Sequence, residues 1–569
     1  MSAETINGAR IVLETLHRLG VTDMFGYPGG AVIPIYDEIY SFPEIKHYFV
    51  RHEQGAAHAA DGYARVSGKV GVCLATSGPG ATNLVTGIMT AYMDSVPMVA
   101  ITGQVGRALI GKDSFQEADI QGITMPITKH NYLVQDIHDL PRIIKEAYFI
   151  AGTGRPGPVL IDIPKDIQTE KISMAEYNKL YDVPIQLEGY DPTYKGHQGQ
   201  IKKAATLIKN AKRPLIIAGA GVLKSGAMAE LKALAEKAQI PVANTLVGLG
   251  GFPGNHELAL GMVGMHGSVA ANNCTEDADL VIAAGIRFHD RITGHPDFFC
   301  KKAKIIHIDI DPAEIDKNVT INVPIVGDLK RVLTELNTFV EPTTHESWIA
   351  QIREWQQEYP MVVPKSTHDE LHPQYVLSEL NKIAKDDAII VTDVGQHQMW
   401  AAQFLTHKAP HTIVTSGGAG TMGYGLPAAI GAQVGAPNKQ VILVVGDGGF
   451  QMTCEELMMV RQYNLPIKIV IINNGYLGMV RQWQQIFNDR RYSYVDLEVS
   501  PDFLKLADAF DLKAARFDSV ETFNKDFKSY ITSDESIVLD CRVEREDNVL
   551  PMIPAGGTVS GMMGKKGVL

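Results

Sequence analysis

Two apolar runs and the segment between them decide the fold: residues 440–474 read QVILVVGDGGFQMTCEELMMVRQYNLPIKIVIINN. The runs 441–445 and 467–472 have the length and apolar character of buried strands. Between them, TCEE at residues 453–456 fits a capping box and predicts a helix that runs to about Tyr463. A strand–helix–strand unit of this length is typical of a parallel α/β sheet.

Polar residues follow both strands of this unit, Gly446-Asp447-Gly448-Gly449 after the first and Asn473-Asn474 after the second. Because α/β proteins bind ligands at the carboxyl ends of parallel strands, we expect Asp447 and Asn474 to lie close together. Their oxygens suit Mg²⁺, and the glycines let backbone N–H groups approach a pyrophosphate. Taken alone, GDGG is equally well explained as a tight turn, and the paired asparagines favour a ligand site.

The alternation of apolar runs and helical patterns continues along the chain and predicts three parallel α/β units. A length of 569 residues agrees with this, at roughly 150 residues per domain. Polar stretches without periodicity at 176–200 and 341–373 are interpreted as linkers. The other predicted strands are 70–76, 98–103, 159–163, 214–218, 280–284, 304–310 and 388–392, and helices are predicted at 1–20, 55–66 and 81–93.

Composition excludes several classes of protein. A hydrophobic content of 45% excludes a disordered chain. The 52 Lys and Arg against 64 Asp and Glu give a net charge of −12 without a basic run, which argues against nucleic acid or an anionic membrane as partner. No apolar run approaches the ~20 residues of a membrane span, and the N-terminus lacks the pattern of a signal peptide. The five cysteines are scattered without a CxxC pair, which indicates a reducing cytoplasm.

The spacing of GDGG and Asn-Asn resembles the diphosphate–magnesium motif of thiamine-diphosphate enzymes. In that motif the metal ligands would be Asp447, Asn474 and the main-chain carbonyl of Tyr476. Such a cofactor also needs a carboxylate from another domain, which makes its aminopyrimidine a competent base. Glu53, between a predicted strand at 47–50 and a helix of small residues, fits this role, although a lone glutamate at a helix start is more often a cap or a solvated side chain.

Short motifs along nearly the whole chain resemble the acetohydroxyacid synthases, also called acetolactate synthases. They lie at residues 26–30 (GYPGG), 52–56 (HEQGA), 76–83 (TSGPGATN), 102–105, 154–158, 164–166, 264–267, 287–288, 395–398, 420–423 and 478–483. The resemblance implies that the first and third domains share the thiamine-diphosphate-binding fold around a Rossmann-like middle domain. The expected boundaries are 1–180, 195–340 and 370–550, followed by a tail at 551–569 that resembles a mobile lid.

Enzymes of this family decarboxylate pyruvate and condense the hydroxyethyl unit with a second pyruvate, giving 2-acetolactate, or with 2-ketobutyrate, giving 2-aceto-2-hydroxybutyrate. This is a step of branched-chain amino-acid biosynthesis. The resemblance implies thiamine diphosphate, Mg²⁺ and FAD as cofactors. It also implies a homodimer or homotetramer, in which the first domain of one chain meets the third domain of another, and it allows for a small regulatory subunit.

The resemblance assigns roles around the thiamine. Glu53 would activate the aminopyrimidine, the carbonyl of Gly420 would accept from its amino group, and Met422 would be the apolar wedge that bends the cofactor. Residues matching the diphosphate-binding positions are Gln396, His397, Gly446, Gly448, Gly449 and Met479.

Other matched residues would contact the substrates. Gly30 and Gln104 would stabilise developing oxyanions, and Lys165 would lie near the substrate entrance. Arg287 would bind the carboxylate of the second ketoacid, and Trp483 would shape the pocket for its alkyl group.

The residues that match the flavin-binding positions are Arg155, Gly219, Gly221, Met265, His266, Gly267, Arg287, Asp309 and Asp328. The residues alone support flavin binding only weakly, because the GxGxxG fingerprint after the predicted strand 214–218 has Lys224 in place of its last glycine. The segment 418–423 satisfies GxGxxG and, taken alone, would suggest a dehydrogenase. We interpret it as part of the thiamine site.

Three alternatives stay open at this point. A flavin-dependent pyruvate oxidase shares the three-domain plan, and Arg287 and Trp483 argue against it. A degradative acetolactate synthase would lack the flavin. A thiamine-binding homologue without catalytic activity would keep the fold but not the reaction.

Overall fold

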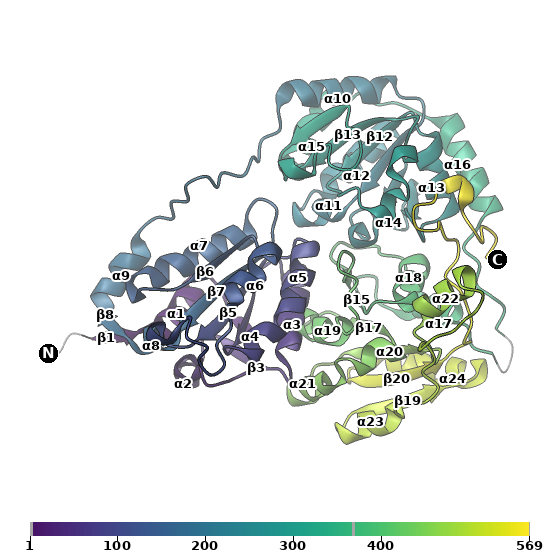
Figure 1. Ribbon diagram of the computed structural model, residues 1–569. Helices are drawn as coiled ribbons and strands as arrows, with labels where there is room; N and C mark the ends of the chain where they lie inside the picture. Colours follow the sequence, from purple (N-terminus) through teal and green to yellow (C-terminus); the bar gives the residue numbers. More distant parts are fainter. Residues whose placement is uncertain (1–3, 367–369, 568–569) are drawn as a thin grey trace.

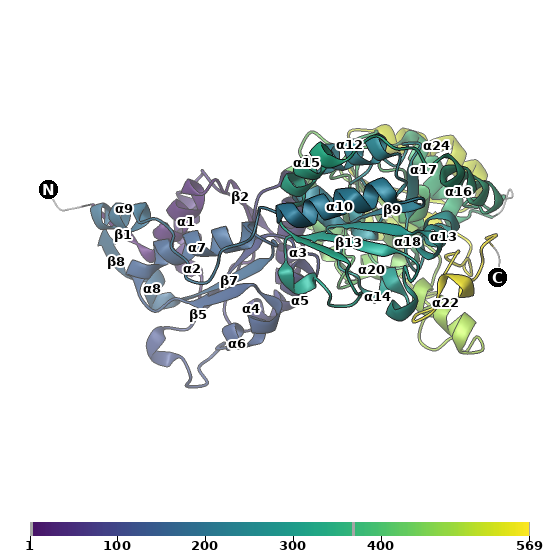
Figure 2. The same cartoon turned by 90° about the horizontal axis from the view of Figure 1, so that it is seen from above.

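The computed structural model describes residues 4–366 and 370–567. Its three α/β domains form separate lobes in Figure 1, with the first at the left, the middle one at the upper right and the third at the lower right. Each has a six-stranded sheet whose neighbouring strands are all parallel, flanked by helices (Figure 2). The prediction of three parallel α/β domains is confirmed.

In the first domain the strand order is β3-β2-β4-β5-β7-β6, and a small antiparallel pair, β1 with β8, closes its outer end. The strands are β1 Thr5–Asn7, β2 Asp23–Gly26, β3 Lys46–Phe49, β4 Gly71–Ala75, β5 Met98–Gln104, β6 His130–Leu133, β7 Pro158–Pro164 and β8 Lys171–Ser173. The helices are α1 Gly8–Arg18, α2 Ile33–Tyr40, α3 Glu53–Ser67, α4 Pro79–Asn83, α5 Val85–Met93, α6 Ile120–Thr124, α7 Leu140–Gly152, α8 Lys165–Thr169 and α9 Met174–Asp182.

The middle domain has the order β11-β10-β9-β12-β13-β14. Its strands are β9 Pro214–Ala218, β10 Val242–Asn244, β11 Ala259–Met262, β12 Leu280–Ala284, β13 Lys304–Asp309 and β14 Val323–Val326. Its helices are α10 Gln198–Asn210, α11 Ala220–Lys224, α12 Met228–Ala238, α13 Val269–Asp277, α14 Asp290–Thr293, α15 Leu329–Phe339 and α16 Glu346–Glu358.

The third domain has the order β16-β15-β17-β18-β20-β19, which repeats the order of the first sheet strand for strand. Its strands are β15 Ile389–Thr392, β16 Ile413–Thr415, β17 Val441–Gly446, β18 Lys468–Asn473, β19 Lys513–Phe517 and β20 Ile537–Arg542. Its helices are α17 Pro373–Ile383, α18 Gln396–Phe404, α19 Gly425–Gly435, α20 Asp447–Gln451, α21 Leu457–Gln462, α22 Gly478–Phe487, α23 Phe503–Ala509 and α24 Val520–Thr532.

The first and third domains share one hydrophobic core, centred on the contact between α3 and α19. Both helices are rich in alanine and glycine, so their backbones come close together. A Cβ atom added to Gly62 would lie 2.1 Å from the carbonyl oxygen of Ala428, and one added to Gly431 would lie 1.8 Å from that of Ala59. Small residues are therefore required at this contact.

The structure differs from the predicted linkers and helices at several places. The stretch 176–200, expected to be a linker, contains most of α9 and the start of α10, so the connection without helix or strand is 183–197. The second predicted linker contains α16, whose Trp348 and Ile352 are buried against the middle domain. The helix expected at 81–93 is divided into α4 and α5 at Leu84. The N-terminal helix is α1, preceded by β1, and the part of that prediction at residues 1–3 lies outside the described residues.

The described part of the tail, residues 551–567, packs against the middle domain beside α13 and α14 (Figure 1). The Ile553 N–H donates to the carbonyl of Met265 at 2.8 Å, and the Gly557 carbonyl accepts from the His295 N–H at 3.0 Å. Among the described residues no helix is both long and apolar enough to cross a membrane.

Candidate active site

The predicted metal residues meet at the carboxyl edge of the third sheet. Strands β17 and β18 are parallel neighbours, with Gly446 opposite Ile472, so Asp447 and Asn474 follow directly at the same edge. A short helix, α20, begins at Asp447 directly after β17. The predicted helix follows it: a 3-10 turn at Cys454–Glu456, directly after Thr453, continues as α21 up to Gln462. The strand–helix–strand unit and the bounds of its predicted helix are confirmed, and the short helix α20 was missed.

The predicted capping box is absent because its two residues bond elsewhere. The Thr453 hydroxyl donates to the carbonyl of Gly423 at 2.9 Å. The buried Glu456 carboxylate accepts from the N–H groups of Arg51 and His52 at 3.0 and 3.1 Å. Glu456 therefore ties the third domain to the residues that immediately precede Glu53.

The environment of the Asp447 carboxylate fits a bound cation. Its side chain is 1% exposed, and its Oδ2 has no hydrogen-bond partner among the described residues. Burial raises the pKa of this carboxyl to about 7. The Asn474 Oδ1 accepts from the Tyr476 N–H at 3.1 Å and keeps a second lone pair. A buried, unpartnered carboxylate oxygen beside an amide oxygen fits Mg²⁺.

A small cavity of about 50 Å³ adjoins this edge. The predicted diphosphate and metal residues that line it are Gln396, His397, Met422, Gly446, Asp447, Gly448, Gly449, Asn474, Tyr476 and Met479. Burial lowers the pKa of His397 to about 3, and its Nε2 has no partner among the described residues, so a neutral imidazole is available to a ligand. Gln396 is already engaged, since its Nε2 donates to Gln482 and to the Asp547 carbonyl, both at 2.9 Å.

Close packing within the protein is enough to explain the glycines at the carboxyl edge of the third sheet. A Cβ atom on Gly449 would lie 2.3 Å from the Oδ1 of Asp393, and one on Gly446 would lie 2.8 Å from the Nδ1 of His397. Gly420 has φ of +63°, a conformation that favours glycine, and its nearest neighbour would be Val394 at 3.9 Å. Its segment joins β16 to α19, within the third domain, as expected for a part of the thiamine site.

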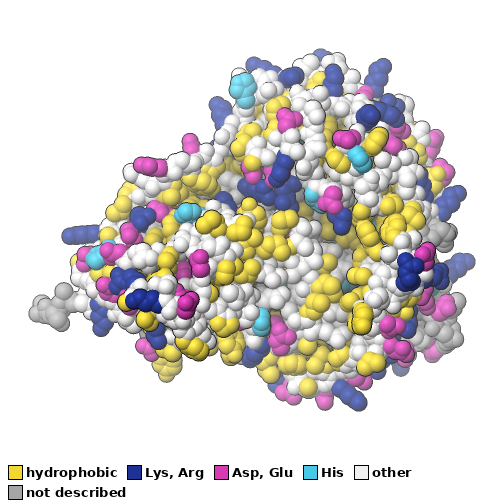
Figure 3. Space-filling model, in the orientation of Figure 1, with side chains coloured by type: hydrophobic (Ala, Val, Ile, Leu, Met, Phe, Trp, Pro, Cys, Tyr) yellow, Lys and Arg dark blue, Asp and Glu magenta, His cyan; other side chains and the backbone are white. Residues whose placement is uncertain are grey.

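A cavity of about 810 Å³ lies where the three domains meet. Figure 3 shows Lys and Arg side chains gathered in the hollow between the lobes. The predicted residues lining the cavity are Arg155, Gly219, Gly221, Met265, His266, Arg287, Asp309, Asp328, Gly420, Met422, Met479 and Trp483. Gly267 is not one of them, because it packs on the Met262 carbonyl, 2.5 Å from where its Cβ would be.

The charged groups of this large cavity differ in how they are paired. Arg155 is held by Asp311 at 3.0 Å and by Glu314 at 2.7 Å. The Arg287 side chain makes no ion pair within the described part of the chain, and burial lowers its pKa. Burial raises the pKa of Asp309 to about 6. An unpaired guanidinium in a large, partly apolar cavity fits an anionic organic ligand, and the cavity has room for a dinucleotide.

Gly219 and Gly221 have a structural explanation. A Cβ atom on Gly219 would lie 2.2 Å from the Gly285 carbonyl oxygen, and one on Gly221 would lie 2.6 Å from the Gly285 Cα. The turn after β9 therefore packs backbone against backbone on the turn after β12.

The remaining predicted residues lie at the carboxyl edge of the first sheet, in a different place. Glu53 is 9% exposed at the start of α3, and its Oε2 accepts from the Asn83 amide at 3.0 Å. Gly30 has open space around it, and Lys165 is exposed at the start of α8. None of the described residues that line the two cavities belongs to this group.

Gln104 does not present a free amide, contrary to expectation. Its Nε2 donates to the Ala118 carbonyl and to the Asp162 Oδ2, both at 2.9 Å, and its Oε1 accepts from the Val105 N–H. Both N–H bonds are thus used within the first domain. Asp162 was missed from the sequence because it lies inside an apolar strand, β7, with nothing in its neighbours to mark it.

Two further buried carboxylates were missed. Asp393 follows β15 as Asp447 follows β17, so its position at a strand end was a readable signal. Asp94 follows α5, and no sequence signal marks it, because its partners Gly417 and Gly418 belong to another domain.

Comparison with known proteins agrees with this architecture. The family models described as "Thiamine pyrophosphate enzyme, N-terminal TPP binding domain", "central domain" and "C-terminal TPP binding domain" match residues 6–123, 201–336 and 393–541. The chain is 48% identical to an acetolactate synthase large subunit of Lactococcus lactis, over 98% of this chain and 96% of that one. It is 49% identical to that of Pyropia yezoensis, over 98% and 95%, and 48% identical to an acetolactate synthase of Arthrospira platensis, over 99% and 98%.

The matched models cover the domains that carry the two cavities and Glu53, in the order in which they occur along the chain. Three relatives at nearly half identity extend the match over almost the full length. The chain belongs to the thiamine pyrophosphate enzymes and, within them, to the acetolactate synthase large subunits.

Proposed function

We propose that this chain decarboxylates pyruvate and joins the resulting two-carbon unit to a second ketoacid, giving 2-acetolactate from pyruvate or 2-aceto-2-hydroxybutyrate from 2-ketobutyrate. The observation that carries the proposal is the buried, unpartnered Asp447 carboxylate beside Asn474, in a domain that matches a thiamine-binding family model. When bound, thiamine diphosphate supplies a carbon acid that adds to the ketoacid carbonyl and stabilises the charge left as CO₂ departs.

The residues of this chain bind and orient that cofactor. Asp447, Asn474 and the carbonyl of Tyr476 hold Mg²⁺, and His397 with the glycines of the small cavity accommodates the diphosphate. Gly420 would accept a hydrogen bond from the cofactor through its carbonyl, and Met422, which lines both cavities, would pack against the bound cofactor and orient it.

Glu53 holds a proton at the far ring nitrogen of the pyrimidine. The pyrimidine that it serves is bound by the third domain of a second copy of the chain. This is supported by its place on the first sheet, away from both cavities of its own chain. The functional unit is therefore a homodimer or a homotetramer. The name "large subunit" of several relatives supports a small regulatory partner.

The large cavity binds the second ketoacid and FAD. Arg287, unpaired within the described chain, takes the ketoacid carboxylate, and Trp483 bounds the space for its alkyl group. Arg155, His266, Asp309 and Asp328 line the same cavity and would contact the flavin, a role that the size of the cavity and the family resemblance support. We assign the reaction to the cytoplasm, in keeping with five free cysteines.

Product analysis tests the proposal. Purified protein is incubated with pyruvate, thiamine diphosphate and Mg²⁺, with and without FAD, and 2-acetolactate is expected. Acetate or acetyl phosphate with flavin turnover would instead identify a pyruvate oxidase, and full activity of flavin-free protein would identify a degradative synthase.

The role of Glu53 is tested with Glu53→Gln, and the exposed Glu44→Gln of the same domain serves as the control. We expect Glu53→Gln to lose about 10²–10⁴-fold in turnover and the control to keep its activity. Unchanged acetolactate formation by Glu53→Gln would contradict the mechanism, and an active monomer in sedimentation would contradict the shared site.

A further inference from the structure

Two buried carboxylates hold the segment of the third domain that carries Gly420 and Met422. At its far end, the Asp393 Oδ1 accepts from the Gly423 N–H at 3.2 Å and its Oδ2 from the Gly425 N–H at 2.7 Å. At its near end, two consecutive N–H groups, those of Gly417 and Gly418, are bound by Asp94 of the first domain.

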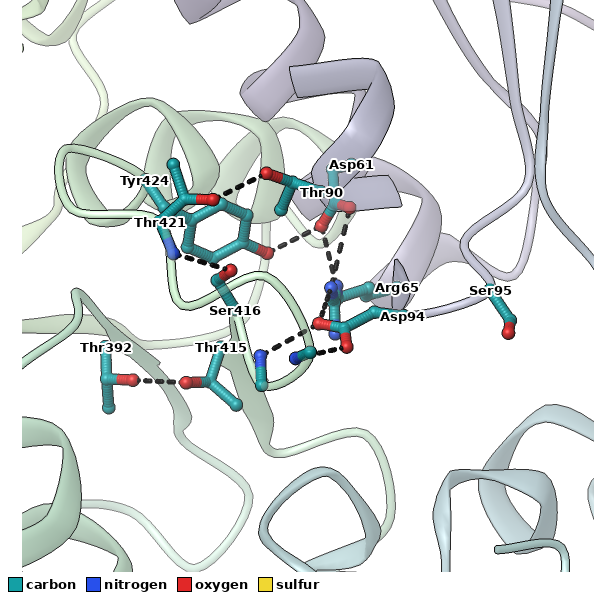
Figure 4. Close-up of polar contacts among 12 residues, drawn as sticks. Asp61, Arg65, Thr90, Asp94, Ser95, Thr392, Thr415, Ser416, Thr421 and Tyr424 are labelled. Carbon is teal, nitrogen blue, oxygen red and sulfur yellow. Dashed lines mark hydrogen bonds and ion pairs between the residues drawn. The ribbon is translucent and has the colours of Figure 1, made fainter. Parts of the chain in front are cut away.

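The Asp94 contacts are short and use both carboxylate oxygens. Its Oδ2 accepts from the Gly417 N–H at 2.9 Å and its Oδ1 from the Gly418 N–H at 2.8 Å (Figure 4). The approach is so close that a Cβ atom on Gly418 would lie 2.9 Å from the same Oδ1. A second contact supports the segment, since the hydroxyls of Thr90 and Thr421 are 2.7 Å apart.

The charge on Asp94 is compensated from its own domain. Arg65 donates to the Asp94 Oδ2 at 2.9 Å and to the Asp61 Oδ1 at 2.6 Å (Figure 4). Burial acts to raise the pKa of Asp94, but the Arg65 guanidinium and the Gly417 N–H outweigh it and hold the pKa below its ordinary value. Asp94 is therefore ionised, and its bonds to the glycines are charge-assisted.

Asp94 is also bound to the middle domain. The Lys224 Nζ donates to the main-chain carbonyls of Asp94 and Ser95 at 2.5 and 2.6 Å. Asp94, Ser95 and Lys224 all line the large cavity. One residue at the end of α5 thus connects the three domains where their surfaces meet.

We propose that Asp94 is a positioning residue for thiamine diphosphate: it fixes the segment 416–423, so that the Gly420 carbonyl and the Met422 side chain are held where the pyrimidine binds. The roles of Gly420 and Met422 rest on the proposed function. Rigid support of a binding group lowers the entropic cost of ordering that group when the ligand binds. Loss of Asp94 therefore weakens cofactor binding, even though Asp94 contacts the segment 416–423 and not the cofactor itself.

The test compares Asp94→Asn with Asp61→Asn in the full-length protein. Both changes remove one carboxylate from Arg65, but only the first one breaks the bonds to Gly417 and Gly418, because an asparagine amide places an N–H group against one of the two donors. Asp61→Asn disturbs instead the hydrogen bond from Tyr424, 2.6 Å long in the native protein. Calorimetric titration with thiamine diphosphate and Mg²⁺ measures affinity without turnover.

We expect both variants to unfold at a lower temperature and only Asp94→Asn to bind thiamine diphosphate about tenfold or more weakly. At saturating cofactor, the KM for pyruvate of Asp94→Asn stays within about twofold of the wild type. A general structural defect would not separate these parameters. If Asp94→Asn does not fold, Asp94→Glu, which keeps the charge beside Arg65 but moves the carboxylate, is expected to show a several-fold loss of affinity.

Affinity within about twofold of the wild type in the folded Asp94 variant would overturn the inference. An equal loss of affinity in Asp61→Asn would overturn it too, because the domain contact as a whole would then be responsible. Wild-type protein that binds no thiamine diphosphate would overturn the proposed function itself, an outcome that is distinct from the other two.

Discussion

The contact between α3 and α19 predicts the effect of a single added methyl group. In Gly431→Ala the new Cβ would lie 1.8 Å from the carbonyl oxygen of Ala59, whereas Cβ atoms essentially never come within 3.0 Å of such an atom. The two helices must therefore move apart to admit the methyl group. Neither atom can rotate away, since both are fixed to helix backbone.

The magnitude follows from opposing terms. Overpacking of a well-packed core costs about 1–3 kcal/mol, and the separation also weakens contacts between neighbouring residues of the shared core. Replacing a helical glycine by alanine returns up to about 1 kcal/mol through helix propensity. Because the clash is with fixed backbone, the upper end of the overpacking cost applies, and about 3 kcal/mol less about 1 kcal/mol leaves a net loss of about 2 kcal/mol. We also expect weaker thiamine diphosphate binding, because Asp94 and the 416–423 segment lie across the same contact between domains.

Differential scanning calorimetry and cofactor titration measure the two effects. Gly152→Ala is the matched control, because this glycine ends α7 and its new Cβ would meet Val70 at an ordinary 3.5 Å. The control is expected to unfold at or slightly above the wild-type temperature. If Gly431→Ala were as stable as Gly152→Ala, the close approach of α3 and α19 would not exist in solution and the reasoning would fail.

Two further predictions concern buried carboxylates. Asp447→Asn is expected to raise the Mg²⁺ concentration needed for half-maximal thiamine diphosphate binding at least about tenfold, because a neutral amide replaces the carboxylate with its unpartnered Oδ2. The measurement is a Mg²⁺ titration of protein from which metal has first been removed by a chelator. An unchanged Mg²⁺ requirement would contradict the metal site. Burial raises the pKa of Asp162 from 3.8 to about 7, so between these pH values the folded state binds more protons than the unfolded state. The free energy of unfolding therefore falls by at most about 4 kcal/mol as the pH rises from about 4 to about 7. Asp162→Asn should flatten that fall in denaturant titrations at several pH values, and an identical slope in the variant would assign the effect to another group.

The sequence predicted the parts of the fold that depend on local pattern. Strands β17 and β18 lie within one residue of their predicted positions, because continuous apolar runs between polar ends are hard to read otherwise. Helix α20 was missed, since Asp447-Gly448-Gly449 has poor helix propensity and tertiary packing forms the helix there. Helix α16 was missed because only a narrow side of it, around Trp348 and Ile352, is buried.

In the candidate site, too, some residues could be predicted from local sequence pattern and others could not. Asp447 and Asn474 could be placed because each follows a strand, and topology puts strand ends together. Asp94 and Glu456 could not be placed, since each bonds backbone N–H groups of another domain, far away along the chain. The engagement of the Gln104 amide by Asp162 depends on the register between β5 and β7, which no local pattern specifies.

The joint core of the first and third domains has a consequence for synthesis of the chain. Helix α3 is complete at Ser67, but the helix that covers it, α19, ends only at Gly435, so the ribosome must make the rest of the first domain, the whole middle domain and the start of the third in between. At a synthesis rate of roughly 5–20 residues per second this takes on the order of tens of seconds. For that time the alanine-rich face of α3 on the nascent chain is uncovered and open to chaperones, and a chain that stalls in the middle domain is a natural substrate for quality control.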